Sequence, residues 1–319
     1  MHPPIALLVF NRPETTRLVF ESVREARPSK LLVVADGPRA DRPEDHGRCE
    51  EVRQIVQNVD WPCDLRLCFR EENLGCRRSV AEGLDWVFAQ VEQAIILEDD
   101  CLPDPSFFPF CAELLLRYEK DPLVGMISGD NFQGGRHATS DSYYFSRHCH
   151  IWGWATWRRA WQKMDLTLSA WPDLRKTGWL RSVVGSGRKH YFWTMWLDDA
   201  HMGDQGGLKT WDMAWAFACL KDGMKCIIPC VNLVQNIGVG ENATHTQGGG
   251  AWQQLSAGTM HFPLLHPTST ECNLEADEFT EQTHYGAGLL QRMFYTCQLP
   301  IKLRTILKVQ RWMRGFFRG

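Results

Sequence analysis

The stretch Ala94-Ile95-Ile96-Leu97-Glu98-Asp99-Asp100 decides the fold expected for this chain. Its four apolar residues have the length and composition of a buried strand, of the kind found in parallel sheets. Three carboxylates follow at once, at the end of the strand where open α/β sheets bind their ligands. Because like charges repel one another there, the pattern favours a divalent cation such as Mn²⁺ or Mg²⁺, which prefers oxygen ligands and bridges to phosphate. A solvated acidic turn is the alternative.

The chain before this stretch alternates between strand and helix patterns. Apolar runs predict strands at 5–10, 31–35 and 65–69, and a further strand is predicted at 123–128. Apolar residues at helical spacing predict helices between them, so we expect a Rossmann-like α/β fold, a mainly parallel sheet with flanking helices. No G-x-G-x-x-G follows the first strand, and a dinucleotide site is therefore not supported.

The regular alternation ends near residue 132. Beyond it we expect a short strand at 143–145, only short helices over 160–210, an apolar helix starting at Trp211-Asp212, and a strand at 226–231. A polar loop carrying Gly, Asn and His follows at 236–246, and loops of this kind often contact ligands.

Composition and charge exclude some classes of protein. The formal net charge of −3 over 319 residues argues against a nucleic-acid partner, which normally needs a basic surface. No apolar run approaches the twenty or so residues of a membrane span, and the chain enters its first strand directly, so we expect a cytoplasmic protein. None of the twelve cysteines forms a C-x-x-C pair, and several lie in apolar segments. We therefore expect reduced thiols and no structural zinc.

Several sequence blocks, taken in order, resemble a known family. They are "NRPETT" after the first strand, "ADGP" after the second, "ILEDDCLPDPSFFPF", "WGWATWRRAW" and "TWDMAW", with a terminal loop ending in His. This series resembles the GT-A nucleotide-sugar glycosyltransferases, in particular the family of the Golgi N-acetylglucosaminyltransferase that starts N-glycan branching and its bacterial relatives. The resemblance covers the first 250 residues and not the last seventy.

The resemblance implies roles for residues that match its motifs. Asp100 would bind Mn²⁺ (or Mg²⁺) that bridges the donor diphosphate, with Asp99 near the ribose and Glu98 near the donor sugar. Asp36 and Arg12 would hold the uracil base. The expected donor is therefore a UDP-sugar.

The second half of the chain supplies the remaining candidates. The resemblance implies that Asp212 is the general base and that His245 lies in a loop that orders when the donor binds. Trp152, Trp154 and Trp211 are candidates for acceptor contacts, because flat apolar rings can take sugar rings; plain core packing is the alternative.

These roles together predict a metal-dependent inverting glycosyltransferase. A divalent metal neutralises the leaving diphosphate, and one carboxylate deprotonates the attacking hydroxyl. A lone base without a second carboxylate nucleophile favours single displacement, and hence inversion. We expect a hexosyl- or N-acetylhexosaminyltransferase acting on a glycan or lipid-linked acceptor, as in polysaccharide biosynthesis. The alternatives are a sugar nucleotidyltransferase, whose usual Gly- and Lys-bearing phosphate loop is missing here, and a non-catalytic carbohydrate-binding protein on the same fold.

The expected domain organisation follows from this assignment. Residues 1–250 would form the GT-A domain, with 1–130 as the nucleotide-binding half and 131–250 as the acceptor half. Residues 251–319 would form a C-terminal helical extension, mildly acidic and weakly structured over 251–290. The tail at 301–319 combines basic and apolar residues, which fits either a helix on the inner face of a membrane or a helix docked on the domain.

Overall fold

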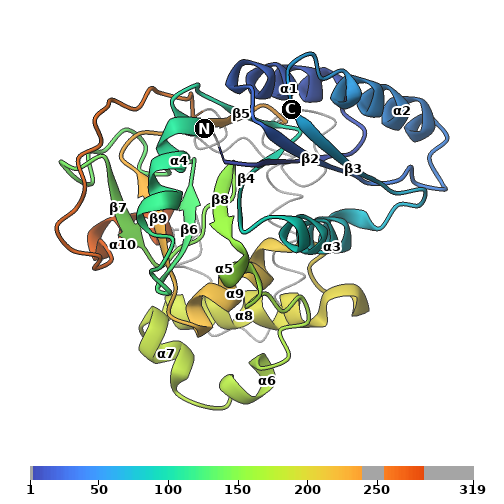
Figure 1. Cartoon of the computed structure of the whole chain (residues 1–319). Coiled ribbons are helices and arrows are strands. Elements are labelled where there is room, and N and C mark those ends of the chain that lie inside the picture. The colour runs from blue at the N-terminus through green and yellow to red at the C-terminus, as the bar shows by residue number, and fades with distance from the viewer. Residues whose placement is uncertain (1–2, 239–254, 284–319) are drawn as a thin grey trace, which may run out of the picture.

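The computed structural model describes residues 3–238 and 255–283 (Figure 1). In the described residues an eight-stranded sheet has the order β3-β2-β1-β4-β8-β6-β9-β7, and a two-stranded sheet pairs β10 with β5. The strands are β1 (Ile5–Val9), β2 (Lys30–Ala35), β3 (Asp64–Phe69), β4 (Gln93–Glu98), β5 (Cys101–Pro103), β6 (Val124–Ser128), β7 (Tyr143–Ser146), β8 (Trp154–Trp157), β9 (Lys225–Pro229) and β10 (Val234–Asn236).

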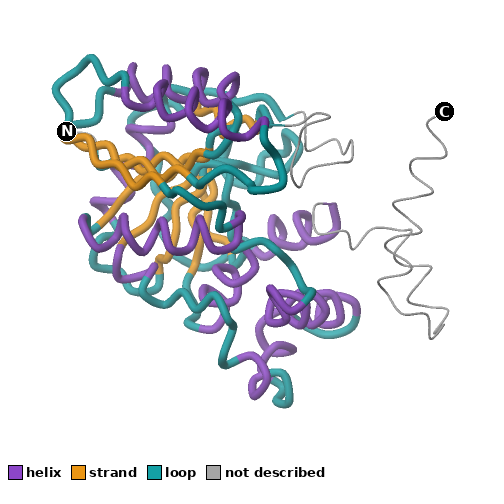
Figure 2. Tube along the Cα trace, turned by 90° about the vertical axis from the view of Figure 1, so that its right-hand side faces the viewer, coloured by secondary structure: helices purple, strands orange, loops and turns teal. Residues whose placement is uncertain are grey.

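Helices cover both faces of the sheet, and Figure 2 shows the strands as a layer between them. The helices are α1 (Pro13–Ala26), α2 (Glu44–Gln57), α3 (Gly75–Gln90), α4 (Phe107–Arg117), α5 (Arg158–Trp161), α6 (Trp171–Leu174), α7 (Trp179–Val184), α8 (Arg188–Met202), α9 (Asp212–Lys221) and α10 (Leu274–Thr283). A 3₁₀ turn, η1, spans Gly203–Gln205.

Side chains alternate between two cores along the central strands, as a period of two requires. Ile5 and Leu7 of β1 pack with α1, α2 and α4, whereas Ala6 and Leu8 pack with α3, α5 and α9. Strands β3, β2, β1 and β4 are mutually parallel. Both faces of β1 are covered, which explains why its sequence is a continuous apolar run instead of an alternating one.

The α/β architecture predicted from the sequence is confirmed. The strands expected at 5–10, 31–35, 65–69, 94–97, 123–128, 143–145 and 226–231 all form, with ends shifted by one or two residues. The sheet also joins the two expected halves of the domain, because strands from 131–250 pair with strands from 1–130.

Strand β8 was not predicted, although it lies at the centre of the sheet. It runs antiparallel to both β4 and β6, with Ile96 opposite Trp154 and Ile127 opposite Ala155. All four of its residues are buried. A short segment buried on both faces gives no alternation, and three tryptophans within six residues conceal its strand character.

Helix α8 contradicts the expectation of only short helices over 160–210, because it is 15 residues long. Its buried apolar face is narrow, with Trp193, Leu197 and Ala200 at helical spacing. The remaining side chains are polar or partly exposed, so the periodic signal is weak.

The described part of the C-terminal extension is packed on the domain. The backbone of Cys272 forms an isolated parallel β-bridge with Phe145 of β7, and α10 begins at Leu274. Asp277 of α10 is buried, accepts a hydrogen bond from Ser146 Oγ at 2.5 Å and pairs with Arg147 Nε at 3.0 Å. The segment 255–283 is therefore packed on the domain, and within it 274–283 form a helix.

Two expectations lie outside the described residues, the placement of His245 and the basic tail at 301–319. Within the residues that the structure describes, no helix is both long and apolar enough to span a bilayer.

We expect Trp154→Ala to lower the free energy of unfolding by about 3–5 kcal/mol, because it removes a fully buried aromatic side chain from the central strand. Urea denaturation followed by circular dichroism measures the change. Leu116→Ala is the control, since Leu116 is 73% exposed, and it should change the free energy by less than about 0.5 kcal/mol. Equal effects of the two substitutions would contradict the burial of β8.

Candidate active site

The acidic residues Glu98, Asp99 and Asp100 lie where β4 turns into β5. Strand β1 is the parallel neighbour of β4, with Leu8 opposite Glu98, so the residues that follow β1 reach the same edge of the sheet. Arg12 Nη1 lies 2.6 Å from Asp100 Oδ2 and 3.4 Å from Asp99 Oδ1. The backbone N–H of Phe10 also donates a hydrogen bond to Asp99 Oδ2, at 3.0 Å. The sheet topology thus brings Arg12 into contact with Asp99 and Asp100.

The charges at this edge are not balanced among the residues that the structure describes. Burial, together with the charges of Asp100 and Asp99, raises the pKa of Glu98 to about 8. Burial and the charge of Asp100 likewise raise the pKa of Asp99 to about 7. Burial alone would lower the pKa of Arg12, but Asp99 and Asp100 raise it. One guanidinium therefore does not offset three carboxylates, and a further cation would stabilise their ionised forms.

These carboxylates fit a divalent metal, although not as a closed protein cage. Among the described residues, no three carboxylate or imidazole ligand atoms converge at this edge within 4.8 Å of one another. Mg²⁺ and similar ions often take one or two carboxylates and complete their shell with substrate phosphates and water. Asp100, with the oxygen chemistry and excess negative charge around it, suits this open kind of metal site.

A second segment closes over Asp100 from the other half of the chain. Strand β10 pairs antiparallel with β5, and the N–H of Ile237 donates a hydrogen bond to the backbone oxygen of Asp100 at 2.8 Å. Next along the chain, a Cβ atom added at Gly238 would lie 2.3 Å from Asp100 Oδ2. Glycine is therefore required at 238, because any side chain would displace the carboxylate.

Asp212 approaches the same group of charges from α9. It is the first residue of this helix, and its Oδ1 accepts a hydrogen bond from the N–H of Met213 at 2.9 Å. Burial is the main cause of the raised pKa of Glu98 and of the partly buried Cys76, and the charge of Asp212 contributes to both. The predicted base and the acidic triplet thus share one electrostatic environment.

Asp36, predicted to hold a base, is engaged within the chain. Its Oδ1 accepts hydrogen bonds from the N–H groups of Gly37 and Leu74, and its Oδ2 from Gly75 N–H and the Asn73 side chain, all at 3.0–3.1 Å. These four bonds use the four acceptor positions of a carboxylate. Asp36 therefore orders the loop that begins α3, and direct contact with a base would require exchange of one of these bonds.

A polar network that was not predicted from the sequence lies beside the end of β1. Asp45 of α2 is buried, accepts a hydrogen bond from Asn11 Nδ2 at 2.7 Å and pairs with Arg39 Nε at 2.5 Å. The guanidinium of Arg39 also lies over the ring of Phe10, 5.4 Å from its centroid. Arg39 and Asp45 lie in a charged segment with no recognisable motif, so only the fold reveals that they border the site.

The three candidate acceptor tryptophans differ in exposure. Trp154 and Trp211 are 0% and 2% exposed and stack with ring centroids 5.5 Å apart. They are core residues, as the alternative interpretation of the tryptophans held. Trp152 is partly exposed and packs edge-on against Phe132 at 5.1 Å, so it alone of the three offers ring surface to a sugar.

Comparison with known proteins shows only distant similarities. No protein-family model and no curated protein matches the chain. Among solved structures, the galactosyltransferase LgtC in complex with donor and acceptor sugar analogs matches with a TM-score of 0.33 and 12% identity, over 54% of this chain and 65% of its own. GalNAc-T7 with UDP, GalNAc and Mn²⁺ matches with a TM-score of 0.42 and 11% identity, over 72% of this chain and 43% of its own. At such values neither similarity identifies the activity of this chain.

The raised pKa values predict that these residues make the metal-free protein less stable as the pH rises. Glu98 and Asp99 keep their protons to about pH 8 and 7 when folded, whereas unfolded carboxyl groups lose them near pH 4. The folded state binds more protons between these limits, so the contribution of these residues to the free energy of unfolding falls as pH rises from about 4 to about 8.

Urea denaturation at a series of pH values in EDTA, on wild type and Glu98→Gln, tests this expectation. The substitution removes the titrating group, so the difference between the two proteins should grow in favour of Glu98→Gln toward pH 8. Glu119→Gln, at an exposed position, is the control. A pH-independent difference between wild type and Glu98→Gln would contradict the raised pKa.

Proposed function

We propose that this chain is a metal-dependent glycosyltransferase with a GT-A fold, which moves a sugar from a UDP-sugar to a hydroxyl of a glycan or glycolipid acceptor. The observation that carries the proposal is the shared environment of Arg12, the triplet Glu98–Asp100 and Asp212, which come from three separate elements. A protein that only binds carbohydrate needs neither the excess negative charge of the triplet nor the carboxylate of Asp212 beside it. The sequence blocks that resemble the family contain all of these residues.

The donor would bind at the carboxyl ends of β1, β2 and β4. Asp100 would hold Mn²⁺ or Mg²⁺, and the metal would neutralise the diphosphate of the donor. Asp99 and Glu98 would lie near the ribose and the donor sugar. The loop that Asp36 orders would shape the base pocket. Arg12 already holds Asp100 at 2.6 Å, so it would fix the orientation of the metal-binding carboxylate as well as contribute to binding the base.

Asp212 would act as the general base. Its carboxylate takes the proton of the acceptor hydroxyl while that oxygen forms a bond to the anomeric carbon and the bond to the diphosphate breaks, releasing UDP. The anomeric centre is attacked once, from the side opposite the leaving group, so the configuration inverts. Asp212 lies in the first turn of α9, where the helix N-terminus favours negative charge.

Trp152, packed against the buried Phe132, is the best candidate for an acceptor surface. The pair lies next to β8, and Trp152 keeps part of its ring exposed. An aromatic platform of this kind stacks on the apolar face of a sugar ring.

Calorimetric titration of UDP in the presence of Mn²⁺ tests the donor site. We expect binding that EDTA abolishes, and Asp100→Asn should weaken it by about 10–100-fold, as for loss of a metal-binding partner. Glu119→Gln should bind as wild type does, because its side chain is exposed and distant in sequence from the site. Nucleotide binding that is the same with Mn²⁺ and with EDTA would contradict the role of Asp100, and absence of any UDP binding would overturn the proposal.

Asp212→Asn should lower kcat by about 10²–10⁴-fold, the usual contribution of a general base, and leave UDP binding close to that of wild type. Release of UDP from a UDP-sugar with an active acceptor gives the rate. Asp222→Asn is the matched control, because Asp222 caps the other end of the same helix and pairs with Lys163 at 3.6 Å. A kcat of Asp212→Asn within a few-fold of the control would assign the base to another residue.

A further inference from the structure

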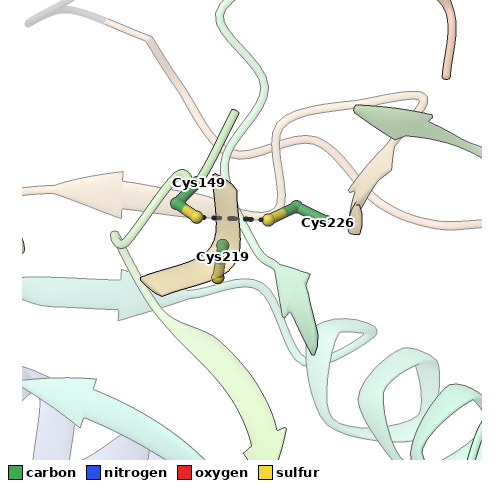
Figure 3. A group of neighbouring side chains, drawn as sticks. All are labelled: Cys149, Cys219 and Cys226. Atoms are coloured by element: carbon green, nitrogen blue, oxygen red, sulfur yellow. Dashed lines mark hydrogen bonds between the residues drawn. The ribbon is translucent and has the colours of Figure 1, made fainter. Parts of the chain in front are cut away.

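Three cysteines from separate parts of the chain meet on the α3/α9 face of the sheet. Cys149 lies between β7 and β8, Cys219 lies on α9, and Cys226 lies on β9. Figure 3 shows the sulfur atoms of Cys149 and Cys226 pointing toward each other, with Cys219 beside them. The three Sγ atoms all lie within 4.8 Å of one another, and the Sγ atoms of Cys149 and Cys226 are 3.3 Å apart. This separation exceeds the length of a disulfide bond, about 2.05 Å, so the sulfurs are in contact without being bonded.

The spacing fits three thiolates around one metal ion. With metal–sulfur bonds of about 2.3 Å, tetrahedral or trigonal geometry places the sulfurs about 3.8–4.0 Å apart. The sulfur atoms of Cys149 and Cys226 are 3.3 Å apart and no pair of the three is more than 4.8 Å apart, so each separation needs to change by at most about 1 Å to reach those values. Among the described residues this is the one group of three His, Cys, Asp or Glu ligand atoms that converge so closely.

The surroundings of the three sulfurs are buried. Cys219 and Cys226 are 0% exposed, and Cys149 is partly buried against the same core. The Sγ atoms of Cys149 and Cys226 lie within hydrogen-bond distance of each other, and either can be the donor. A soft cation bound by the three thiolates would replace their protons.

The segment that carries Cys149 is held from outside the cluster. Arg147 pairs with the buried Asp277 at 3.0 Å, and His148 Nε2 lies 3.1 Å from Glu281 Oε1. Both acids belong to α10, so this helix fixes the chain on the side of Cys149. Cys219 and Cys226 are fixed by helix α9 and strand β9. A site held in place by three regular elements loses little conformational entropy when an ion binds.

We propose that Cys149, Cys219 and Cys226 form a binding site for one soft metal ion, either Cu⁺ or Zn²⁺. Thiolate ligands select such ions, whereas Mn²⁺ and Mg²⁺ prefer the oxygens of the acidic edge, so the two sites take different metals. Three sulfurs suit Cu⁺ in trigonal coordination; Zn²⁺ would add a water as its fourth ligand. The expectation from the sequence of no structural zinc rested on the absence of a C-x-x-C pair, and this cluster needs none, because the fold supplies the spacing.

Titration of the full-length, reduced and chelator-treated protein with Cd²⁺, Zn²⁺ or Cu⁺ tests the site. Cd²⁺ should give a sulfur-to-metal charge-transfer band that saturates at one equivalent. Zn²⁺ and Cu⁺, added against competing chelators, should displace it, and the tighter of the two identifies the preferred ion. Thermal unfolding of the loaded protein should shift to higher temperature, since the ion binds the folded chain.

Single substitutions identify the ligands. Cys219→Ala and Cys226→Ala should each lose the one-equivalent band, and Cys111→Ala should keep it, because Cys111 is an equally buried cysteine outside the cluster. Absence of a stoichiometric band in the wild-type protein would overturn the proposal, whether or not the variants fold. A band of wild-type strength in either cluster variant would also overturn it, as would a Cys149–Cys226 disulfide that survives reduction, detected by mass spectrometry.

Discussion

The contact between the guanidinium of Arg12 and the carboxylates of Asp99 and Asp100 is the constraint on which the candidate active site depends. It exists because β1 and β4 are adjacent and parallel, so that both strands end at the same edge of the sheet. Burial makes the contact strong. Burial also disfavours the ionised form of the three carboxylates, and one guanidinium does not offset this effect. The edge of the sheet is thus stable enough to form, but the negative charge of its carboxylates is not fully neutralised. A protein that binds a metal and a diphosphate at such an edge neutralises this charge when the metal and substrate bind.

The sequence predicts the parts of this molecule that local pattern determines. Buried strands such as β1 and β4 are continuous apolar runs, and the position of Arg12 and the acidic triplet at their ends follows from parallel topology alone. Strand β8 was not predicted because its segment does not alternate between apolar and polar residues. The burial of Trp154 and Trp211, in turn, depends on the position of that strand between β4 and β6. The four hydrogen bonds to Asp36 and the pairing of Asp45 with Arg39 were also hidden, since each joins segments that carry no common motif.

Helix α9 connects two kinds of chemistry. Its first residue, Asp212, faces the charges of the acidic edge, and Cys219 lies two turns later, about 10 Å along the axis, among the sulfurs. A carboxylate beside the acidic edge and one sulfur of the cysteine cluster therefore lie on one rigid element. An ion held by the sulfurs would fix the position of the helix along its axis, and hence the distance from Asp212 to the donor. Nearly all of the middle of the helix is packed in the core, so the helix can hold both Asp212 and Cys219 in place.

The antiparallel pairing of β8 with β4 also has a consequence for biosynthesis on the ribosome. The first four parallel strands are complete once residue 98 has emerged, but the other edge of β4 stays unpaired until residues 154–157 follow, and β10 covers β5 later still. The exposed edge is the apolar run Ala94–Leu97, the type of segment that pairs with other chains during aggregation. A nascent chain that ends between residues 98 and 154 therefore has β4 paired along one edge only. The charged residues Glu98, Asp99 and Asp100, which directly follow that run, also oppose intermolecular pairing while the chain is incomplete.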